Sequence, residues 1–167
     1  MNDFENRYCY EYPRPMVTVD IVCFRQTCEG VRVLLIRRGK KPFKDCWAIP
    51  GGFVEMEEGL ETAARRELKE ETHLEPVKME QFYCFGEPGR DPRGRTISIA
   101  FLAWIDDKDE ASVAKIRADD DACDVQWFDP EKLPPLAFDH DKIIRRARKT
   151  FDEWRKMGKI EVGREES

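Results

Sequence analysis

The stretch GGFVEMEEGLETAARRELKEETHL, residues 51–74, decides the fold. Within it, residues 61–72 predict the clearest helix of the chain. At about 100° per residue, Glu67, Glu70 and Glu71 fall on one face of this helix, because they are three and four positions apart. That face also carries Leu60, Ala63 and Ala64, with Leu68 at its flank, whereas Glu61, Arg65, Lys69 and Thr72 lie opposite. Three carboxylates are therefore predicted to point toward the protein body.

This placement of the carboxylates favours a metal site. A glutamate-rich helix is more often a solvated one, but its carboxylates then lie opposite the apolar stripe. Like charges at these spacings repel one another, and burying even part of them is costly unless cations neutralise them. Oxygen ligands select Mg²⁺ or Mn²⁺, and Mg²⁺ completes its shell with waters and substrate phosphates. The pattern predicts a phosphate-handling site that binds a divalent metal.

The glutamates belong to a longer pattern of fixed spacings. Its positions are Gly52, Glu58, Arg66, Glu67, Leu68, Glu70, Glu71 and Leu74. This pattern resembles the catalytic box of the Nudix hydrolases, G-x5-E-x7-R-E-U-x-E-E-x-G-U with U a bulky aliphatic residue, and it matches eight of the nine fixed positions. The preceding WAIPGG, residues 47–52, resembles the segment that leads into the box.

The one departure from the box is His73, which stands where the family usually has glycine. That glycine ends the helix in the left-handed region, where it has no Cβ penalty. Histidine is among the other residues that are enriched there, so we expect the same turn and an active site that survives. A capping role is favoured over a role of His73 as catalytic base.

The resemblance also implies roles for individual residues. The metal ligands are expected to be Glu67, Glu70, Glu71 and the backbone carbonyl of Gly51, with Arg66 and Glu58 orienting the carboxylates. The metals would neutralise the diphosphate, activate a water and stabilise the leaving phosphate. A general base would come from the box, such as Glu67, or from an acid on a later loop, for which Asp120 and Asp121 are candidates. A solvated acidic loop explains residues 119–121 equally well.

Segments outside the box resemble the bacterial-type ADP-ribose pyrophosphatase branch of the family. They are YPRPMVTVD (12–20), LLIRRGKKPF (34–43), FGEPGRDPRGRTISIAFLAW (85–104) and LAFDHDKI (136–143). The likeness implies cleavage of ADP-ribose to AMP and ribose 5-phosphate. Candidates for binding phosphate or ribose are Arg37, Arg38, Arg90, Arg93 and Arg95. Tyr8, Tyr10 and Tyr12 are candidates for stacking on adenine, although packing against a second subunit of an expected homodimer is the commoner use of such residues.

The rest of the chain predicts an α/β (α+β) fold, a Nudix-type mixed β-sheet sandwiched between helices. The expected strands are 16–24 and 31–37, which form a hairpin, and 79–85, 96–105 and 125–128; the expected loops are 39–52, 86–94 and 106–122. A final amphipathic helix is expected from an N-cap at Asp139 to about Met157. We expect an N-terminal segment (1–15), one domain (16–160) and a disordered tail (161–167).

Composition narrows the class of partner and compartment. A net charge of −5 and a pI near 5.3 argue against nucleic acid as the main partner. The N-terminus has no signal-peptide pattern and no stretch is long and apolar enough for a membrane, so a cytoplasmic protein is expected. The six cysteines form no C-x-x-C pair, which disfavours a zinc site. Four of them, Cys23, Cys46, Cys84 and Cys123, are interpreted as small core residues.

Two alternatives to an ADP-ribose hydrolase remain. The first is a nucleotide-cleaning or broad nucleoside-diphosphate hydrolase, because the box is shared by these enzymes. The second is an ADP-ribose-sensing regulator, but relatives of that kind add a winged-helix region, and only about forty residues follow Phe128. The basic residues of the last helix, Arg145, Arg146, Arg148 and Lys149, are explained by a solvated outer face.

Overall fold

The computed structural model describes residues 9–75, 78–105, 116 and 122–160. This part of the chain contains nine elements. They are β1 (Met16–Thr27), β2 (Gly30–Arg38), β3 (Trp47–Ala48), β4 (Gly51–Phe53), α1 (Leu60–Thr72), β5 (Lys78–Phe85), β6 (Thr96–Ile105), β7 (Ala122–Phe128) and α3 (His140–Lys156). None of the described helices is long and apolar enough to cross a membrane.

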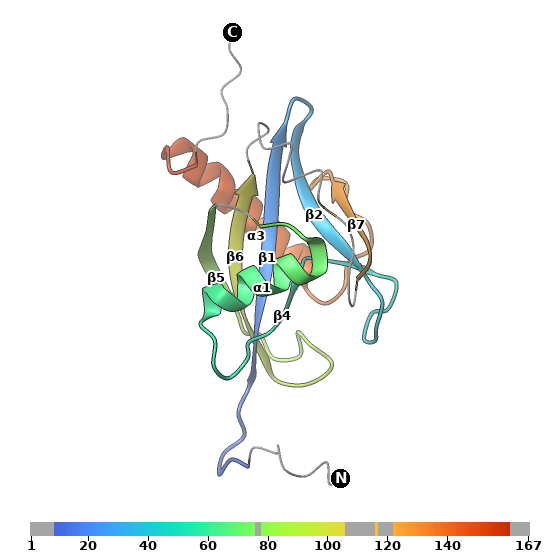
Figure 1. Cartoon of the computed structure of the whole chain (residues 1–167), viewed down its shortest axis with the longest axis vertical. Helices are drawn as coiled ribbons and strands as arrows, with labels where there is room; N and C mark the ends of the chain where they lie inside the picture. Colours follow the sequence, from blue (N-terminus) through green and yellow to red (C-terminus); the bar gives the residue numbers. More distant parts are fainter. Residues whose placement is uncertain (1–8, 76–77, 106–115, 117–121, 161–167) are drawn as a thin grey trace.

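The strands form one seven-stranded sheet in the order β3-β2-β1-β6-β5, with β4 also paired to β1 and β7 to β2. β1 and β6 run parallel over ten residue pairs, and the other pairings are antiparallel, so the sheet is mixed. Helix α1 lies on one face of the sheet and α3 on the other (Figure 1). The predicted sheet between helices is confirmed.

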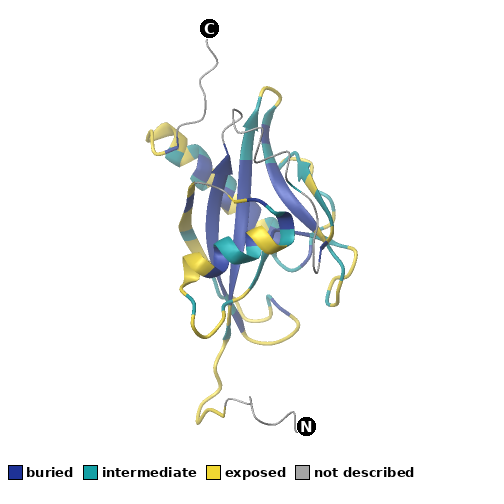
Figure 2. Ribbon diagram, in the orientation of Figure 1, coloured by how far each residue is buried: buried dark blue, intermediate teal, exposed yellow. Residues whose placement is uncertain are grey.

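Alternation along β1 divides the apolar core into two layers. Val19, Ile21 and Cys23 pack on the side of α1, whereas Val22 and Phe24 pack on the side of α3. Figure 2 shows that the central strands are buried between the two helices. The chain therefore holds α1 and the start of α3 in fixed positions on opposite faces of β1.

β1 changes partner along its length on the side away from β6. Residues 18–20 pair with β4, whereas residues 24–27 pair with β2. Between these two pairings the Ile21 N–H donates to the carbonyl of Pro50, at 2.9 Å. The sheet is thus opened where β2 and β4 diverge, and this opening positions the site described below.

Residues 39–52, expected to be a loop, contain β3 and β4, so that prediction is wrong in part. The glycines that suggested a loop are required in the strand by close approach. A Cβ on Gly51 would overlap the backbone of Val19, and a Cβ on Gly52 would overlap the carboxylate of Glu67. Glycine here permits tight packing instead of a turn.

The prediction of which α1 residues face the protein body is correct for Ala63, Ala64 and Leu68, which are buried, and wrong for Thr72 and Leu60. Thr72 is fully buried, which is possible because its hydroxyl donates to the carbonyl of Leu68, four residues earlier. Leu60 is exposed, at the first residue of the helix.

The expectation for the cysteines holds for Cys23, which is fully buried, and Cys46 is half-buried. Cys84 and Cys123 are exposed, because they lie on outward-facing positions of β5 and β7. The prediction that they are core residues is therefore wrong.

Helix α3 begins at His140 after Asp139, as predicted, and buries Ile143, Ile144, Ala147 and Phe151. The Asp139 carboxylate makes no capping hydrogen bond, because it pairs with Arg90 instead. Residues 1–8 and 161–167, and nearly all of the expected loop 106–122, lie outside the described residues.

Candidate active site

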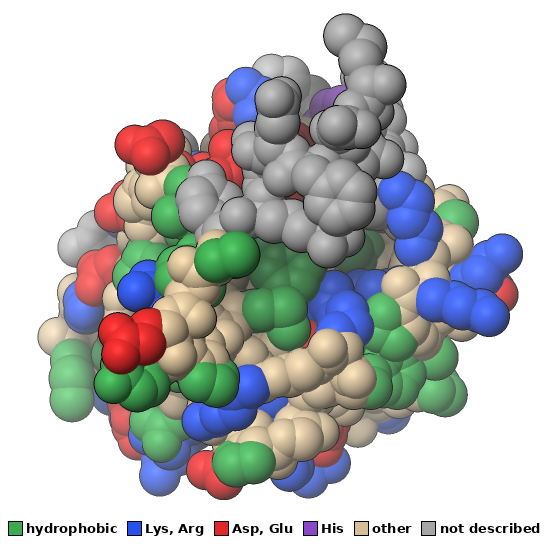
Figure 3. Space-filling view, turned by 90° about the horizontal axis from the view of Figure 1, so that it is seen from below, with side chains coloured by type: hydrophobic (Ala, Val, Ile, Leu, Met, Phe, Trp, Pro, Cys, Tyr) green, Lys and Arg blue, Asp and Glu red, His purple; other side chains and the backbone are tan. Residues whose placement is uncertain are grey.

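A pocket of about 370 Å³ lies where β1 changes partner. Its lining combines carboxylates, cations and aromatic rings from several elements. The lining residues are Thr18, Asp20, Ile36, Arg38, Lys40, Ile49, Gly51, Gly52, Phe53, Glu55, Arg66, Glu67, Glu71, Arg90, Asp91, Arg93, Phe138 and His140. The face in Figure 3 shows Lys and Arg side chains interspersed with hydrophobic ones.

Arg66 on α1 gathers three carboxylates into what we call the α1 cluster (Glu58, Arg66, Glu67 and Glu70). Its guanidinium donates two hydrogen bonds to Glu58, at 2.6 and 3.0 Å, and single ones to Glu67 at 2.8 Å and Glu70 at 3.1 Å. A further bond goes to the carbonyl of Phe53, at 3.1 Å. The hydrogen bonds from Arg66 lower the pKa of Glu58. One cation thus fixes three carboxylates, which retain an excess of negative charge.

Glu67 is a largely enclosed glutamate of this helix that lines the pocket. Its side chain is 15% exposed and packs against Gly52, where the absence of a Cβ leaves room for it. Burial raises the pKa of Glu67, and the hydrogen bond from Arg66 offsets this only in part. A carboxylate with a raised pKa beside a pocket is a common feature of catalytic sites.

Glu71 anchors the other end of the same wall. Its Oε2 accepts a hydrogen bond from the N–H of Gly51, at 2.9 Å, which ties α1 to the start of β4. At the end of the helix, His73 adopts the left-handed conformation with φ 57°, and its N–H donates to the carbonyl of Lys69. The capping role predicted for His73 is confirmed.

The donor set of this wall suits a hard divalent cation in its chemistry. Among the described residues, no three His, Cys, Asp or Glu side chains lie close enough to share a metal ion. Glu67 and Glu70 are turned toward Arg66, and Glu71 toward Gly51. The candidate ligands nevertheless all offer oxygen, carry an excess of negative charge and include a desolvated carboxylate, which Mg²⁺ or Mn²⁺ would satisfy.

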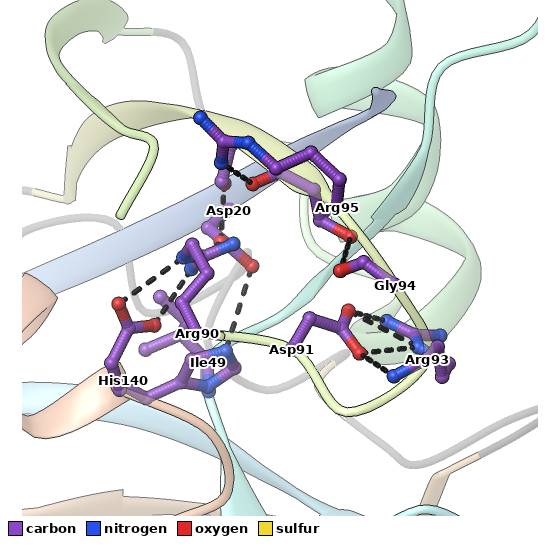
Figure 4. A network of polar contacts seen from close by, with 11 residues as sticks. Asp20, Ile49, Arg90, Asp91, Arg93, Gly94, Arg95 and His140 are labelled. Carbon is purple, nitrogen blue, oxygen red and sulfur yellow. Dashed lines mark hydrogen bonds and ion pairs between the residues drawn. The ribbon is translucent and has the colours of Figure 1, made fainter. Parts of the chain in front are cut away.

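We call a second charged group the floor cluster (Asp20, Arg90, Asp139 and His140). Three of its members, Asp20, Arg90 and His140, line the pocket, and Figure 4 shows them close together. Arg90 donates to both oxygens of Asp139, at 2.7 and 3.1 Å, and to Asp20 at 3.5 Å. Ser98 on β6 donates to the same oxygen of Asp20. Burial alone would lower the pKa of Arg90, but its hydrogen bonds and charge interactions with Asp139 and Asp20 outweigh this and raise it.

His140 joins this cluster to the segment before β4. Its Nδ1 accepts the N–H of Ile49, at 3.1 Å, so the proton of the neutral ring is on Nε2. Nε2 lies 3.7 Å from the Oδ1 of Asp20. Burial lowers the pKa of His140, and the negative charges of Asp20 and Asp139 oppose this effect without cancelling it. His140 is therefore a neutral ring that fixes the backbone two residues before Gly51.

The five predicted substrate-binding arginines divide between pocket and surface. Arg38, Arg90 and Arg93 line the pocket, whereas Arg37 and Arg95 are not among its lining residues. Arg37 pairs with Asp45, and Arg95 bonds to the carbonyl of Thr96. Of the three in the pocket, Arg90 is 5% exposed and is paired with aspartates. This leaves Arg38 and Arg93 as the two with accessible placements.

The other predicted residues are less informative. Asp120, Asp121 and Tyr8 lie outside the described residues. Tyr10 and Tyr12 are exposed, and neither is among the residues that line the pocket. Arg14 lies over the ring of Tyr10, 4.0 Å from its centroid.

Sequence reasoning missed Asp20, His140 and the aromatic pair Phe53 and Phe138. A signal existed for Asp20, which is the one charged residue in the β-branched run MVTVDIVCF. A buried strand position with an aspartate requires a partner, and here Arg90 and Ser98 provide it. His140 and Phe138 carried no comparable signal, because their partners are far away in the sequence.

Known proteins identify the family of this chain. The model of the NUDIX domain matches residues 14–147. An ADP-ribose pyrophosphatase of Methanocaldococcus jannaschii is 42% identical over 134 residues, which cover 80% of this chain and 73% of that protein. An ADPR responsive transcriptional repressor, NtrR of Acinetobacter baylyi, is 34% identical over 141 residues, which cover 82% of this chain and 54% of the repressor.

Solved structures agree with this. The NUDIX domain of Shewanella oneidensis NrtR, complexed with ADP ribose, superposes with a TM-score of 0.77 and 30% identity, covering 90% of this chain and 99% of that one. A MutT/nudix family protein of Enterococcus faecalis gives a TM-score of 0.76 and 32% identity, covering 90% and 67%. The domain match and the 42% identity lead to one conclusion: this chain belongs to the Nudix family of hydrolases.

Proposed function

We propose that this chain hydrolyses ADP-ribose to AMP and ribose 5-phosphate with the help of a divalent cation. The observation that carries the proposal is the two-sided charge of the pocket. Glu67 and Glu71 line one wall, whereas Arg38 and Lys40 line other parts of it. A diphosphate bound with a cation matches this arrangement, because the cation suits the carboxylates and the free phosphate oxygens suit the basic side chains.

The choice of ADP-ribose is supported by the relatives. The protein of M. jannaschii is an ADP-ribose pyrophosphatase, and the NrtR domain binds ADP ribose in its cocrystal structure. Both kinds of relative cover most of this chain. A nucleotide-cleaning or broad nucleoside-diphosphate hydrolase is the alternative within the same chemistry.

The residues of α1 and β4 have separate tasks in this proposal. Glu67, Glu70, Glu71 and the carbonyl of Gly51 would hold Mg²⁺ or Mn²⁺. When bound, such a cation neutralises phosphate charge and makes a water more acidic.

The remaining residues of this wall position the ligands and take the proton. Arg66, itself held by two bonds to Glu58, fixes the rotamers of Glu67 and Glu70. The proton of the attacking water goes to a carboxylate, either Glu67 itself or the acid expected at Asp121.

The test is the rate of hydrolysis with Mg²⁺, measured by chromatography of the products, for a panel of ADP-ribose, NADH, diadenosine polyphosphates, and normal and oxidised nucleoside triphosphates. We expect selective turnover of ADP-ribose, which falls about 1,000-fold in Glu71→Gln, a loss of about 4 kcal/mol of transition-state stabilisation. The matched control is Glu61→Gln, because Glu61 lies on the same helix but faces outward and pairs with Arg65. Preferred turnover of another panel member would contradict the choice of substrate and retain the chemistry.

An ADP-ribose-sensing regulator is the second candidate, and the 34% identity to the repressor NtrR favours it. This chain spans about half the length of that repressor. Three basic residues on the outer face of α3 lie within 4.0 Å of acids of the same helix, namely Arg145 with Asp141, Arg148 with Asp152, and Lys149 with Glu153. Binding of ADP-ribose without any turnover, with either metal, would move the regulator to first place.

A further inference from the structure

Two aromatic rings from distant parts of the chain line the pocket together. Phe53 ends β4 and is 42% exposed, whereas Phe138 precedes α3 and is half-buried. The guanidinium carbon of Arg93 lies 4.9 Å from the ring centroid of Phe53 and 5.3 Å from that of Phe138. One cation is therefore within cation–π distance of both rings.

Phe138 is held in place from both sides. Before it, the N–H of Ala137 donates to the carbonyl of Trp47, at 2.8 Å. After it, Asp139 and His140 are fixed by the floor cluster. Phe138 itself has φ 53°, a left-handed conformation that is strained for a bulky residue and recurs in segments that contact ligands. The ring is presented to the pocket by a backbone that has little freedom to move.

Arg93 is held just as firmly. Its side-chain Nε and Nη2 donate to the carboxylate of Asp91, at 2.7 to 3.1 Å. Its backbone N–H donates to the same carboxylate, at 2.9 Å. The Asp91 side chain is 3% exposed, whereas that of Arg93 is 36% exposed. A planar guanidinium fixed along one edge stacks well on flat partners.

Phe53 connects this group to the α1 cluster. Its carbonyl accepts a hydrogen bond from Arg66, at 3.1 Å, while its side chain lines the pocket. Gly51 and Gly52 immediately precede it. A ligand with its diphosphate at the α1 cluster would therefore have the adjoining nucleoside beside the ring of Phe53.

We propose that Phe53, Arg93 and Phe138 form the stacking site for the adenine base of the substrate. The inference rests on the proposed function, because it assigns the base of that same substrate. Aromatic faces combined with a fixed guanidinium suit a nucleobase, which binds by its π-face. Tyr10 and Tyr12, two of the three tyrosines named as candidates for stacking on adenine, are not part of the pocket lining.

The test is calorimetric titration of AMP and of ribose 5-phosphate, with Mg²⁺ present, into the wild type and into Phe53→Leu and Phe138→Leu. Leucine and phenylalanine both carry a Cβ, so both are equally strained at positive φ. Phe138→Leu therefore replaces the aromatic ring without changing the backbone strain. We expect the affinity for AMP to fall about tenfold in each variant and that for ribose 5-phosphate to change by less than about twofold. Phe138→Tyr should restore the affinity for AMP.

The matched control is Tyr83→Leu. Tyr83 is 41% exposed and has the guanidinium of Arg146 over its ring at 3.7 Å, but it lies on β5 and not in the pocket. This variant should bind AMP like the wild type. Unchanged AMP affinity in both phenylalanine variants would overturn the proposal, as would equal losses for AMP and ribose 5-phosphate, which would indicate a distorted pocket.

Failure of the proposed function is a separate result. AMP binding is measured without turnover, so the stacking site can be confirmed even if ADP-ribose is not hydrolysed. If ADP-ribose is hydrolysed, the two leucine variants should raise KM more than they lower kcat, because stacking contributes to the substrate and transition state alike.

Discussion

The α1 cluster and the floor cluster each place one arginine among carboxylates at the same pocket, yet they differ in balance and burial. Arg66 is 24% exposed and bonds to three carboxylates, of which Glu70 is 46% exposed. Arg90 is 5% exposed and bonds to two aspartates. The first cluster sets three carboxylates against one guanidinium, which leaves its excess of negative charge in reach of solvent. The second sets two carboxylates against one guanidinium, so its excess is smaller and enclosed.

This difference separates a binding role from a structural one. A surplus of carboxylates at an accessible wall can be relieved by a cation, so the α1 cluster is suited to bind one. The carboxylates of the floor cluster accept hydrogen bonds from Arg90 and Ser98 within the protein. The cluster joins β1, β6, the loop before β6 and the start of α3.

The largest effect that separates the clusters is expected from replacing each arginine by methionine. Arg90→Met leaves Asp20 and Asp139 buried without their cation, so unfolding free energy should fall by about 3 kcal/mol. Arg66→Met should cost about 1 kcal/mol, because its carboxylates are nearer to solvent, but should reduce hydrolysis of ADP-ribose 10- to 100-fold, about 1.4 to 2.7 kcal/mol of transition-state stabilisation. Urea unfolding and steady-state kinetics measure the two losses.

Added Mg²⁺ is the control for the two arginine variants. It should recover part of the stability lost in Arg66→Met, since the cation takes the place of the guanidinium charge, and none of that lost in Arg90→Met. An Arg90→Met protein that keeps its stability and loses only substrate affinity would show that Arg90 binds phosphate, as first expected from the sequence.

The two clusters also differ in how far the sequence predicts them. The residues of the α1 cluster lie within nine positions of Arg66, and helical geometry at once places Glu67 and Glu70 together. The box pattern then identified the metal-ligand candidates on this helix and the cap at His73.

The floor cluster joins Asp20, Arg90 and His140, and no local periodicity relates such distant positions. The anomaly of an aspartate in a buried strand indicates that a partner exists but not which one. The same limit explains why the pairing of Arg90 with Asp20 and Asp139 was not predicted. Strand β4, which begins with Gly51 and Gly52, was missed because glycine in a sequence indicates a turn more often than a close contact.

A smaller effect is expected from the neighbouring glycines, because Gly51 approaches the backbone of β1 whereas Gly52 approaches a carboxylate of α1. Gly51→Ala would press a Cβ against the Val19 carbonyl at a residue with φ 156°, so about 2 kcal/mol of stability should be lost. In Gly52→Ala the three atoms nearest to the new Cβ all belong to the carboxylate of Glu67, at the end of a flexible side chain. Displacing that carboxylate should lower hydrolysis about tenfold, about 1.4 kcal/mol, with less than about 1 kcal/mol of stability lost.

Thermal unfolding and kinetics of the two alanine variants decide this prediction. Equal loss of stability in both would mean that Glu67 is held as rigidly as the backbone of β1. The α1 cluster would then be a structural element like the floor cluster, and the contrast between them would fail.

The smallest effect concerns pH and arises at His140 of the floor cluster. Burial lowers the pKa of His140 below its ordinary value of 6.5, against the pull of Asp20 and Asp139 and together with the positive charges of Arg90 and Arg38. Below pH 6.5 the unfolded chain takes up a proton that the folded protein does not, so stability is present above this pH and is lost as the pH falls toward the lower folded pKa. Urea unfolding between pH 7.5 and 5.5 should therefore show a decline in the wild type that is smaller in His140→Gln, whereas His73→Asn, which suits a left-handed cap and keeps His140, should retain it. An equal decline in His140→Gln would assign the pH dependence to carboxylates and would leave His140 without a proton-linked part in holding the segment before β4.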